Sequence, residues 1–112
     1  MTDWQETFVR LRQDFARALP SRVERLRQAL AAVPDGGGAG DELRVLHREV
    51  HSLAGAAGSY GFGEVTASCH EAERVCKDLL DAPATLAARR AELDGVLDRL
   101  ARQTRDGSLT ET

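Results

Sequence analysis

The sequence predicts an all-α protein, an antiparallel up-down four-helix bundle with an additional short N-terminal helix. Hydrophobic residues make up 42% of the 112 residues and aromatic residues only 4%, a balance that is typical of helical bundles rather than of sheets. Apolar residues also recur three and four positions apart through five segments, and this spacing gives each segment one apolar face as a helix. The length suits one core, so we expect a single domain over residues 1–112.

The first two expected helices span residues 3–18 and 21–33. The apolar stripe of the first consists of Trp4, Phe8, Leu11, Phe15 and Ala18. Because proline disrupts a helix interior but is tolerated in a first turn, Pro20 should end this helix and let the next one begin. The second stripe consists of Val23, Leu26, Leu30 and Val33.

The third expected helix, residues 42–57, follows a glycine-rich loop, residues 34–40, and Asp41 is its expected N-cap. Its apolar residues repeat in heptads and should face the core: Leu43, Leu46, Val50, Leu53 and Ala57. A turn at residues 58–61 should lead into the next helix.

The last two expected helices span residues 62–80 and 84–103, with Pro83 between them. Their inward stripes are Phe62, Val65, Cys69, Ala72, Cys76 and Leu79, and then Leu86, Leu93, Val96, Leu97 and Leu100. Residues 104–112 form a polar tail that should fray. The short connections favour antiparallel neighbours.

Charge and hydropathy exclude several classes of function. The net charge of −3 arises from both signs mixed along every helix, whereas binding of nucleic acid needs a basic face. No apolar run reaches the roughly 18 residues of a membrane span, and the first residues do not resemble a secretory leader. We therefore expect a cytoplasmic protein that binds neither nucleic acid nor membrane. The short first helix and the narrow apolar seams favour a monomer.

Cys69 and Cys76 lie seven positions apart on one expected helix. Two turns separate their Cα atoms by roughly 10 Å, which is too far for a disulfide. We interpret both as buried thiols that act as small hydrophobic side chains.

The candidate functional residue is His51, which lies in mid-helix with Gly55 four positions later. Glycine in a helix interior costs roughly 0.5–1 kcal/mol relative to alanine, so its presence needs a reason. Imidazole can hold a covalent intermediate, and a neighbour without a side chain lets another molecule approach it. At 100° per residue His51 lies roughly 120° from the core stripe and should be exposed, and His47, Gly55 and Gly58 share its strip. We call these four residues the docking strip.

The spacing of His51, Leu53, Gly55 and Gly61 resembles the phosphoacceptor motif of histidine-containing phosphotransfer (HPt) domains, His-x-Leu-Lys-Gly followed by a further glycine. The segment 69–73, Cys-His-Glu-Ala-Glu, also resembles that family's next helix. By motif the resemblance covers about Leu43 to Glu73, and by helix pattern nearly the whole chain.

The resemblance implies a phosphocarrier: His51 would accept a phosphoryl group from an aspartyl phosphate on one receiver domain and pass it to the aspartate of another. A hybrid histidine kinase and a response regulator are the implied partners. The chain has no glycine-rich loop followed by lysine and no kinase motif, so it should not use ATP. No cofactor is expected on this chain, because the receiver would bring the Mg²⁺. Tyr60 and Phe62 could contribute to the docking surface, although burial in the core is the favoured interpretation for Phe62.

One residue departs from the motif. Ala54 occupies the place of the family's lysine, which is thought to neutralise phosphoryl charge, and the chain's one lysine is Lys77. Arginine can hold phosphate through paired hydrogen bonds, so Arg48, with Arg44 or Arg74 behind it, is a candidate substitute. Alternatively, these arginines are only a solvated helix face.

Two other functions stay open. The domain could be a degenerate, non-phosphorylated adaptor that keeps the receiver-binding surface, with Ala54 as the sign of lost chemistry. Less favoured is a helical-bundle metal site using His47 and His51, whose spacing can offer two imidazoles to a transition metal. A third ligand would have to come from Cys69, His70 or Glu71.

Overall fold

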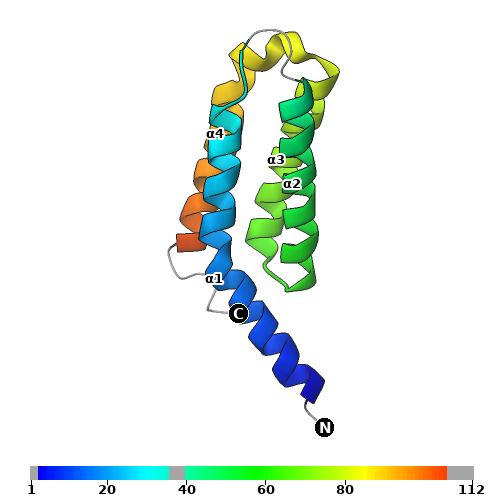
Figure 1. Cartoon of the computed structure of the whole chain (residues 1–112), viewed down its shortest axis with the longest axis vertical. Helices are drawn as coiled ribbons and strands as arrows, with labels where there is room; N and C mark the ends of the chain where they lie inside the picture. The colour runs from blue at the N-terminus through cyan, green and yellow to red at the C-terminus, as the bar shows by residue number, and fades with distance from the viewer. Residues whose placement is uncertain (1–2, 36–39, 106–112) are drawn as a thin grey trace.

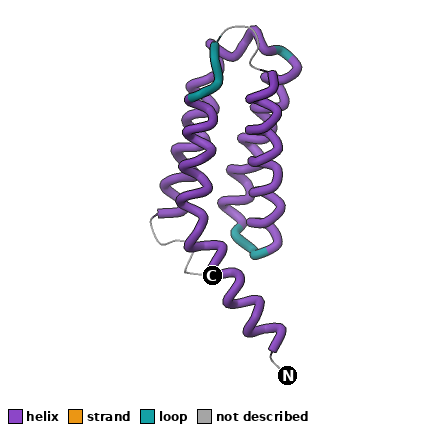
Figure 2. Tube along the Cα trace, in the orientation of Figure 1, coloured by secondary structure: helices purple, strands orange, loops and turns teal. Residues whose placement is uncertain are grey.

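The computed structural model describes residues 3–35 and 40–105 and shows four α-helices in up-down order (Figure 1). The helices are α1 (Asp3–Ala31), α2 (Gly40–Ser59), α3 (Gly63–Asp81) and α4 (Leu86–Arg105), with one 3₁₀ turn at Pro83–Thr85. Helix accounts for nearly all of the described chain (Figure 2). The predicted all-α bundle is confirmed, with helix ends within about two residues of those expected for the last three helices.

The four helices form a closed ring, since α1 and α3 each pack against both α2 and α4. Every member of the stripes expected for the last four segments is buried, and one continuous core results. The largest fully buried side chains are leucines and valines: Leu19, Leu30, Leu43, Leu46, Leu53, Leu79, Leu86, Leu93, Leu97, Leu100, Val23 and Val50. Full burial of each contributes about 1.5–3 kcal/mol. In the described part of the chain, none of the helices is long and apolar enough to cross a membrane.

The prediction of a separate short N-terminal helix is wrong, because α1 continues through Pro20 as one helix of 29 residues. Packing overrides the proline: Leu19 and Val23, on either side of it, are buried in the core. Figure 1 shows that the dark-blue N-terminal part of α1 leans away from the rest of the helix, and a proline is the usual cause of such a bend. At 1.5 Å per residue α1 is about 43 Å long and α2 about 30 Å, so α1 extends beyond the bundle.

The stripe expected for residues 3–18 is mostly not part of the core. Trp4 is 71% exposed, Phe8 41% and Leu11 46%, and Ala18 is also exposed. Only Phe15 is half-buried, between Tyr60 at 5.2 Å and Phe62 at 5.9 Å between ring centroids. The spacing was correct for a helix, but the other three helices are too short to cover the first turns of α1.

The connection between α2 and α3 is a Schellman turn. The Phe62 amide donates to the Ala57 carbonyl and the Gly61 amide to the Gly58 carbonyl, the bond pattern that defines this motif. Gly61 has φ +82°, a conformation that favours glycine. The motif's final glycine therefore ends α2, two residues later than expected, and Gly58 still belongs to the helix.

At the other end of the bundle, α4 holds the C-terminus of α1. The Arg90 guanidinium donates to the carbonyls of Leu30, at 2.7 Å, and Val33, and it pairs with Asp35 at 2.9 Å. A cation on these last carbonyls also complements the helix dipole. Nearby, Asp41 lies inside the first turn of α2 rather than capping it. In the expected polar tail, Thr104 and Arg105 are helical, and residues 106–112 lie outside the described residues.

Candidate functional site

His51 lies on the outer surface of α2, where its side chain is 70% exposed. The stripe of α2 that faces the core is buried, and the helical geometry carries His51 around to the flank that faces α3. The predicted exposure of His51 is therefore confirmed. An imidazole in this place can be reached by another macromolecule.

A glutamate on α3 holds the His51 ring. The Nδ1 atom of His51 lies 2.5 Å from Oε2 of Glu73, and the same carboxylate lies 3.4 Å from Nδ1 of His70 and 4.0 Å from Nε2 of His47. We call His47, His51, His70 and Glu73 the histidine–glutamate cluster. The sequence pattern placed His47 and His51 on one strip but assigned no role to Glu73.

The cluster keeps Glu73 ionised. Partial burial raises the pKa of this carboxyl, but the hydrogen bond and charge of His51, the contact with His70 and the charge of His47 together lower it below its usual value. An ionised carboxylate can only accept hydrogen bonds. Nδ1–H of His51 is therefore the donor, and the proton-free nitrogen of the neutral ring is Nε2.

This tautomer leaves one nitrogen of the His51 ring able to act as a nucleophile. A carboxylate that accepts from one imidazole nitrogen fixes the ring's orientation and stabilises positive charge that develops on the ring. The lone pair on Nε2 lies across the ring from Glu73, and the side chain that carries it is 70% exposed. The arrangement can carry a group on Nε2 without disturbing the core.

The two glycines of the docking strip differ in the space that surrounds them. A Cβ added at Gly55 would meet no heavy atom within 4 Å, whereas one at Gly58 would meet the Thr66 side chain at 3.8 Å, an ordinary contact. Internal packing therefore explains neither glycine. The Ser59 hydroxyl donates to the Gly55 carbonyl at 3.0 Å but does not cover the position next to His51.

The structure separates the candidate cations. Arg44 pairs with Asp41 at 2.9 Å, one turn back along α2 and away from His51. Arg48 and Arg74 are exposed, and neither makes an ion pair within residues 3–35 and 40–105. Ala54 is only 3% exposed, so it lies inside the α2–α3 seam rather than on the docking strip.

Metal binding gains no support from the geometry. Among the described residues, no group of three or more histidine, cysteine, aspartate or glutamate side chains is arranged to hold a metal ion. Of the proposed third ligands, Glu71 pairs with Arg99, Cys69 is buried, and His70 contacts Glu73. The ring centroids of His47 and His51 lie 6.5 Å apart in nearly parallel planes.

Both cysteines are free and buried, as expected. Desolvation by burial raises the pKa of Cys69 and of Cys76 to about 12, so both are protonated at neutral pH. A protonated thiol is a poor nucleophile. The thiols are therefore core side chains, although Cys69 directly precedes a residue of the cluster.

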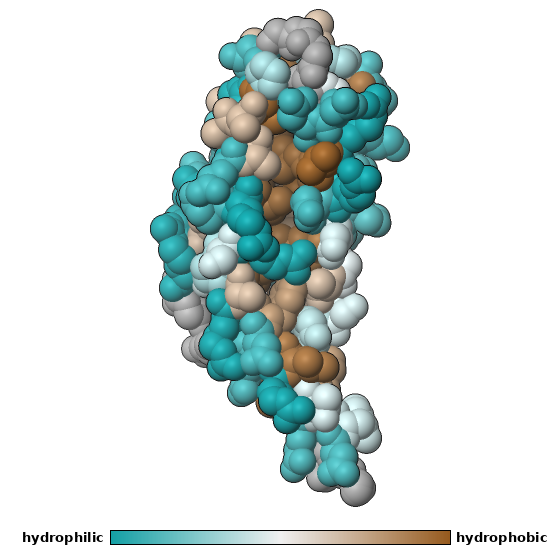
Figure 3. All heavy atoms as spheres, viewed as in Figure 1, coloured by the Kyte–Doolittle hydropathy of each residue, from teal (hydrophilic) through white to brown (hydrophobic). Residues whose placement is uncertain are grey.

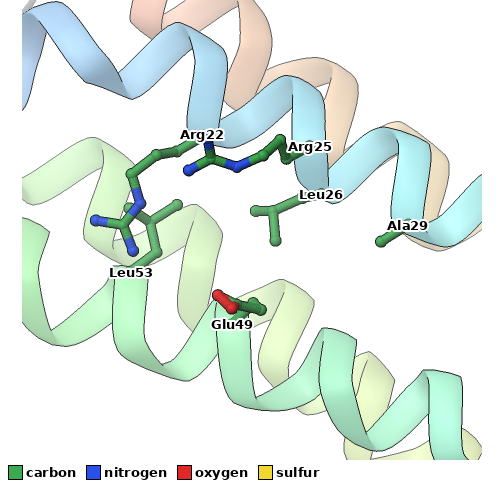
Figure 4. Close-up of a pocket in the computed structure, with 6 residues that line it drawn as sticks. All are labelled: Arg22, Arg25, Leu26, Ala29, Glu49 and Leu53. Carbon is green, nitrogen blue, oxygen red and sulfur yellow. The ribbon is translucent and has the colours of Figure 1, made fainter.

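A groove lies between α1 and α2, away from the histidine–glutamate cluster. Figure 3 shows hydrophobic residues exposed along this furrow between hydrophilic borders. In Figure 4, Arg22 and Arg25 of α1 and Glu49 of α2 surround Leu26 and the other apolar lining residues, Ala29 and Leu53. The groove encloses about 220 Å³, less than the roughly 300–1,000 Å³ of small-molecule sites. It does not contain His51.

The comparison with protein families gave one finding. Residues 10–103 match the family model described as the Hpt domain. The comparisons with curated proteins and with solved structures each gave no match. The matched region contains the whole histidine–glutamate cluster and all but the first turns of α1.

Proposed function

Because the chain belongs to the Hpt domain family, we propose that it is a phosphorelay intermediate that carries the phosphoryl group on His51. Hpt domains are phosphocarriers of two-component signalling that interact with receiver domains and histidine kinases. The observation that supports His51 as the acceptor is its hydrogen bond to Glu73, which leaves Nε2 free on an exposed ring.

The transfer step uses groups that the site provides. The Nε2 lone pair forms a bond to phosphorus, the bond between phosphorus and the receiver's aspartyl oxygen breaks, and its electron pair stays on the regenerated carboxylate. The ring becomes positively charged because Nδ1 keeps its proton. Glu73, 2.5 Å from Nδ1, stabilises that charge and fixes the angle of attack.

The receiver would dock over the docking strip. Gly55 leaves open space beside His51, so a partner's backbone can approach the reacting nitrogen. The Mg²⁺ that phosphoryl transfer requires is expected on the receiver. Tyr60 is half-buried against Phe8 and Phe15, and Phe62 is buried in the core, so we assign neither a docking role.

Arg48 is our candidate for contact with the phosphoryl oxygens. It lies one turn before His51, is exposed and has no ion-pair partner within the described ranges, so it can turn toward a negative group. Arg44 and Arg74 are weaker candidates, since Arg44 already pairs with Asp41 and Arg74 lies on the next helix. An Arg48→Ala protein that accepts and holds phosphate as well as wild type would exclude this role.

The test is phosphotransfer from a panel of receiver domains phosphorylated on aspartate. We expect acid-labile phosphate on wild type and on Ser52→Ala, an exposed neighbour, and none on His51→Gln. Label on His51→Gln would show that a residue other than His51 accepts the phosphoryl group. Receiver binding without label on wild type would instead identify a non-phosphorylated adaptor.

A further inference from the structure

The family's lysine position cannot supply a cation in this chain. The resemblance places a lysine at position 54, one turn after the phosphoacceptor, whereas Ala54 is 3% exposed in the α2–α3 seam. On α2, Arg44 is paired with Asp41, and the exposed Arg48 does not pair with Glu73. A positive charge near the phosphoryl group can also come from across the seam.

The register of the seam shows which residue of α3 faces Ala54. The helices run antiparallel, and two contacts fix their alignment: Gly58 lies opposite Thr66, and His51 lies opposite Glu73. Midway between these two levels, Ala54 lies opposite His70. The small side chain at 54 and the imidazole at 70 therefore occupy the same level of the seam.

His70 is already engaged with the residue that holds His51. Its Nδ1 lies 3.4 Å from Oε1 of Glu73, while Oε2 of the same carboxylate accepts from His51. The His70 side chain is 61% exposed, so the imidazole reaches the surface. One carboxylate thus joins the acceptor imidazole and a second imidazole.

The carboxylate creates an electrostatic problem that this second imidazole can solve. Glu73 must be ionised to hold Nδ1–H, but its negative charge opposes the approach of a phosphoryl group, whose oxygens are also negative. The hydrogen bond to His51 acts only at contact distance. A cation on the other carboxylate oxygen leaves that bond in place and cancels most of the repulsion.

We propose that His70 is a positioning residue that supplies from α3 the positive charge that the family's lysine supplies from α2. It acts on Glu73 and, through Glu73, on the phosphoryl group at His51. The inference rests on the proposed function and adds a second residue that compensates for Ala54, besides Arg48, the candidate for contact with the phosphoryl oxygens.

The other charged groups around Glu73 leave this role to His70. From α2, His47 lies 4.0 Å from the carboxylate, half-buried, on the side away from Gly55. On α3, Arg74 and Lys77 are exposed and neither pairs with Glu73. The arginines that α4 presents to α3 are engaged elsewhere: Arg89 pairs with Asp78 and Glu92, and Arg99 with Glu71.

Because the charge is carried by an imidazole, the rate of transfer should depend on pH, whereas a charge carried by lysine would not change over the same range. Imidazole is positive only while protonated, and an unperturbed histidine titrates near about 6.5. Once deprotonation at higher pH removes the charge of an imidazole, the repulsion from Glu73 returns. Lysine stays charged to about pH 10.

The experiment labels His51 with phosphoramidate, a small donor from which imidazole Nε2 displaces ammonia at phosphorus, so no receiver is required. Initial rates between pH 6 and 8.5 are compared for wild type, His70→Gln and His70→Lys, with His51→Gln as the blank and Glu64→Gln as an exposed control on α3. Circular dichroism checks that each variant is folded.

At pH 6 we expect His70→Gln to be labelled about threefold to fivefold more slowly than wild type, a size typical of charge pairs near a surface. His70→Lys should restore the wild-type rate at pH 6. As pH rises from 6 to 8.5, the rate of wild type divided by that of His70→Lys should fall, because lysine keeps its charge over this range. Equal rates for wild type and His70→Gln across the range would overturn the inference while leaving His51 as the acceptor. No label on wild type would refute the proposed function itself.

Discussion

Replacing Gly55 should stabilise the protein and impair its exchange with receivers. A Cβ at this position enters open space, so Gly55→Ala strains nothing and removes the cost of a mid-helix glycine, about 1 kcal/mol. For a domain of this size that corresponds to a rise in Tm of about 4 °C. Gly95 is a matched control, because it lies in α4 and its added Cβ would also meet nothing within 4 Å.

The functional part of the prediction uses a larger side chain. Leucine is a good helix former, so Gly55→Leu and Gly95→Leu should both fold and both be at least as stable as wild type. Transfer from a phosphorylated receiver should fall more than about tenfold in Gly55→Leu, equivalent to a loss of about 1.4 kcal/mol, and stay unchanged in Gly95→Leu. Labelling by phosphoramidate should change little in either variant, since a small donor needs no docking space.

Three results would contradict this reasoning. Normal receiver transfer by Gly55→Leu would show that the receiver does not approach over Gly55. A lower Tm for Gly55→Ala would show that the glycine serves the fold rather than the partner. Loss of phosphoramidate labelling together with receiver transfer would place the defect at His51 and not at docking.

Three further predictions concern stability and reactivity. Arg90→Ala should lower the free energy of unfolding by about 2–3 kcal/mol in urea denaturation, because the last carbonyls of α1 lose a charged donor, whereas the exposed Arg102→Ala should change it little. Cys69 and Cys76 should not react with a disulfide reagent at pH 8 until urea unfolds the chain, and fast reaction without urea would contradict their burial. The pKa of Glu73 is lowered in the folded state. The contribution of Glu73 to the free energy of unfolding should therefore be complete above about pH 4.3 and be lost as pH falls through the folded pKa. The Tm difference between wild type and Glu73→Gln should therefore shrink below about pH 4, and a constant difference would contradict the assignment.

The sequence predicted the bundle well because the core stripes repeat at helical spacing. The stripes from Val23 onward are buried as expected, since neighbouring helices of similar length cover them. The prediction of a helix break at Pro20 and that of a core position for Trp4 were wrong for a shared reason. Local rules describe what a helix tolerates by itself, whereas packing on either side of Pro20 keeps α1 continuous, and the absence of a facing helix leaves Trp4 in solvent.

Only those features of the candidate site that depend on a single helix could be predicted from the sequence. Helical geometry alone placed His51 on an exposed flank and Gly55 beside it, and both placements hold. The role of Glu73 depends on the register between α2 and α3, which a single-helix pattern does not contain. One signal was available, because the short turn ending at Gly61 limits that register, and His70 and Glu73, three apart, then fall on the seam opposite His51.

The neighbours of His51 along its own helix explain why the carboxylate has to come from α3. Side chains that can reach it lie three or four positions away: His47 and Arg48 on the N-terminal side, and Ala54 and Gly55 on the C-terminal side. None is acidic, so α2 cannot fix the tautomer of its own histidine. The same four residues make the two sides of His51 different. The N-terminal side carries a histidine and an arginine, and the C-terminal side carries only small residues. A receiver that approached over the small side would bring its aspartyl phosphate to Nε2, with Arg48 beyond the ring to meet the phosphoryl oxygens.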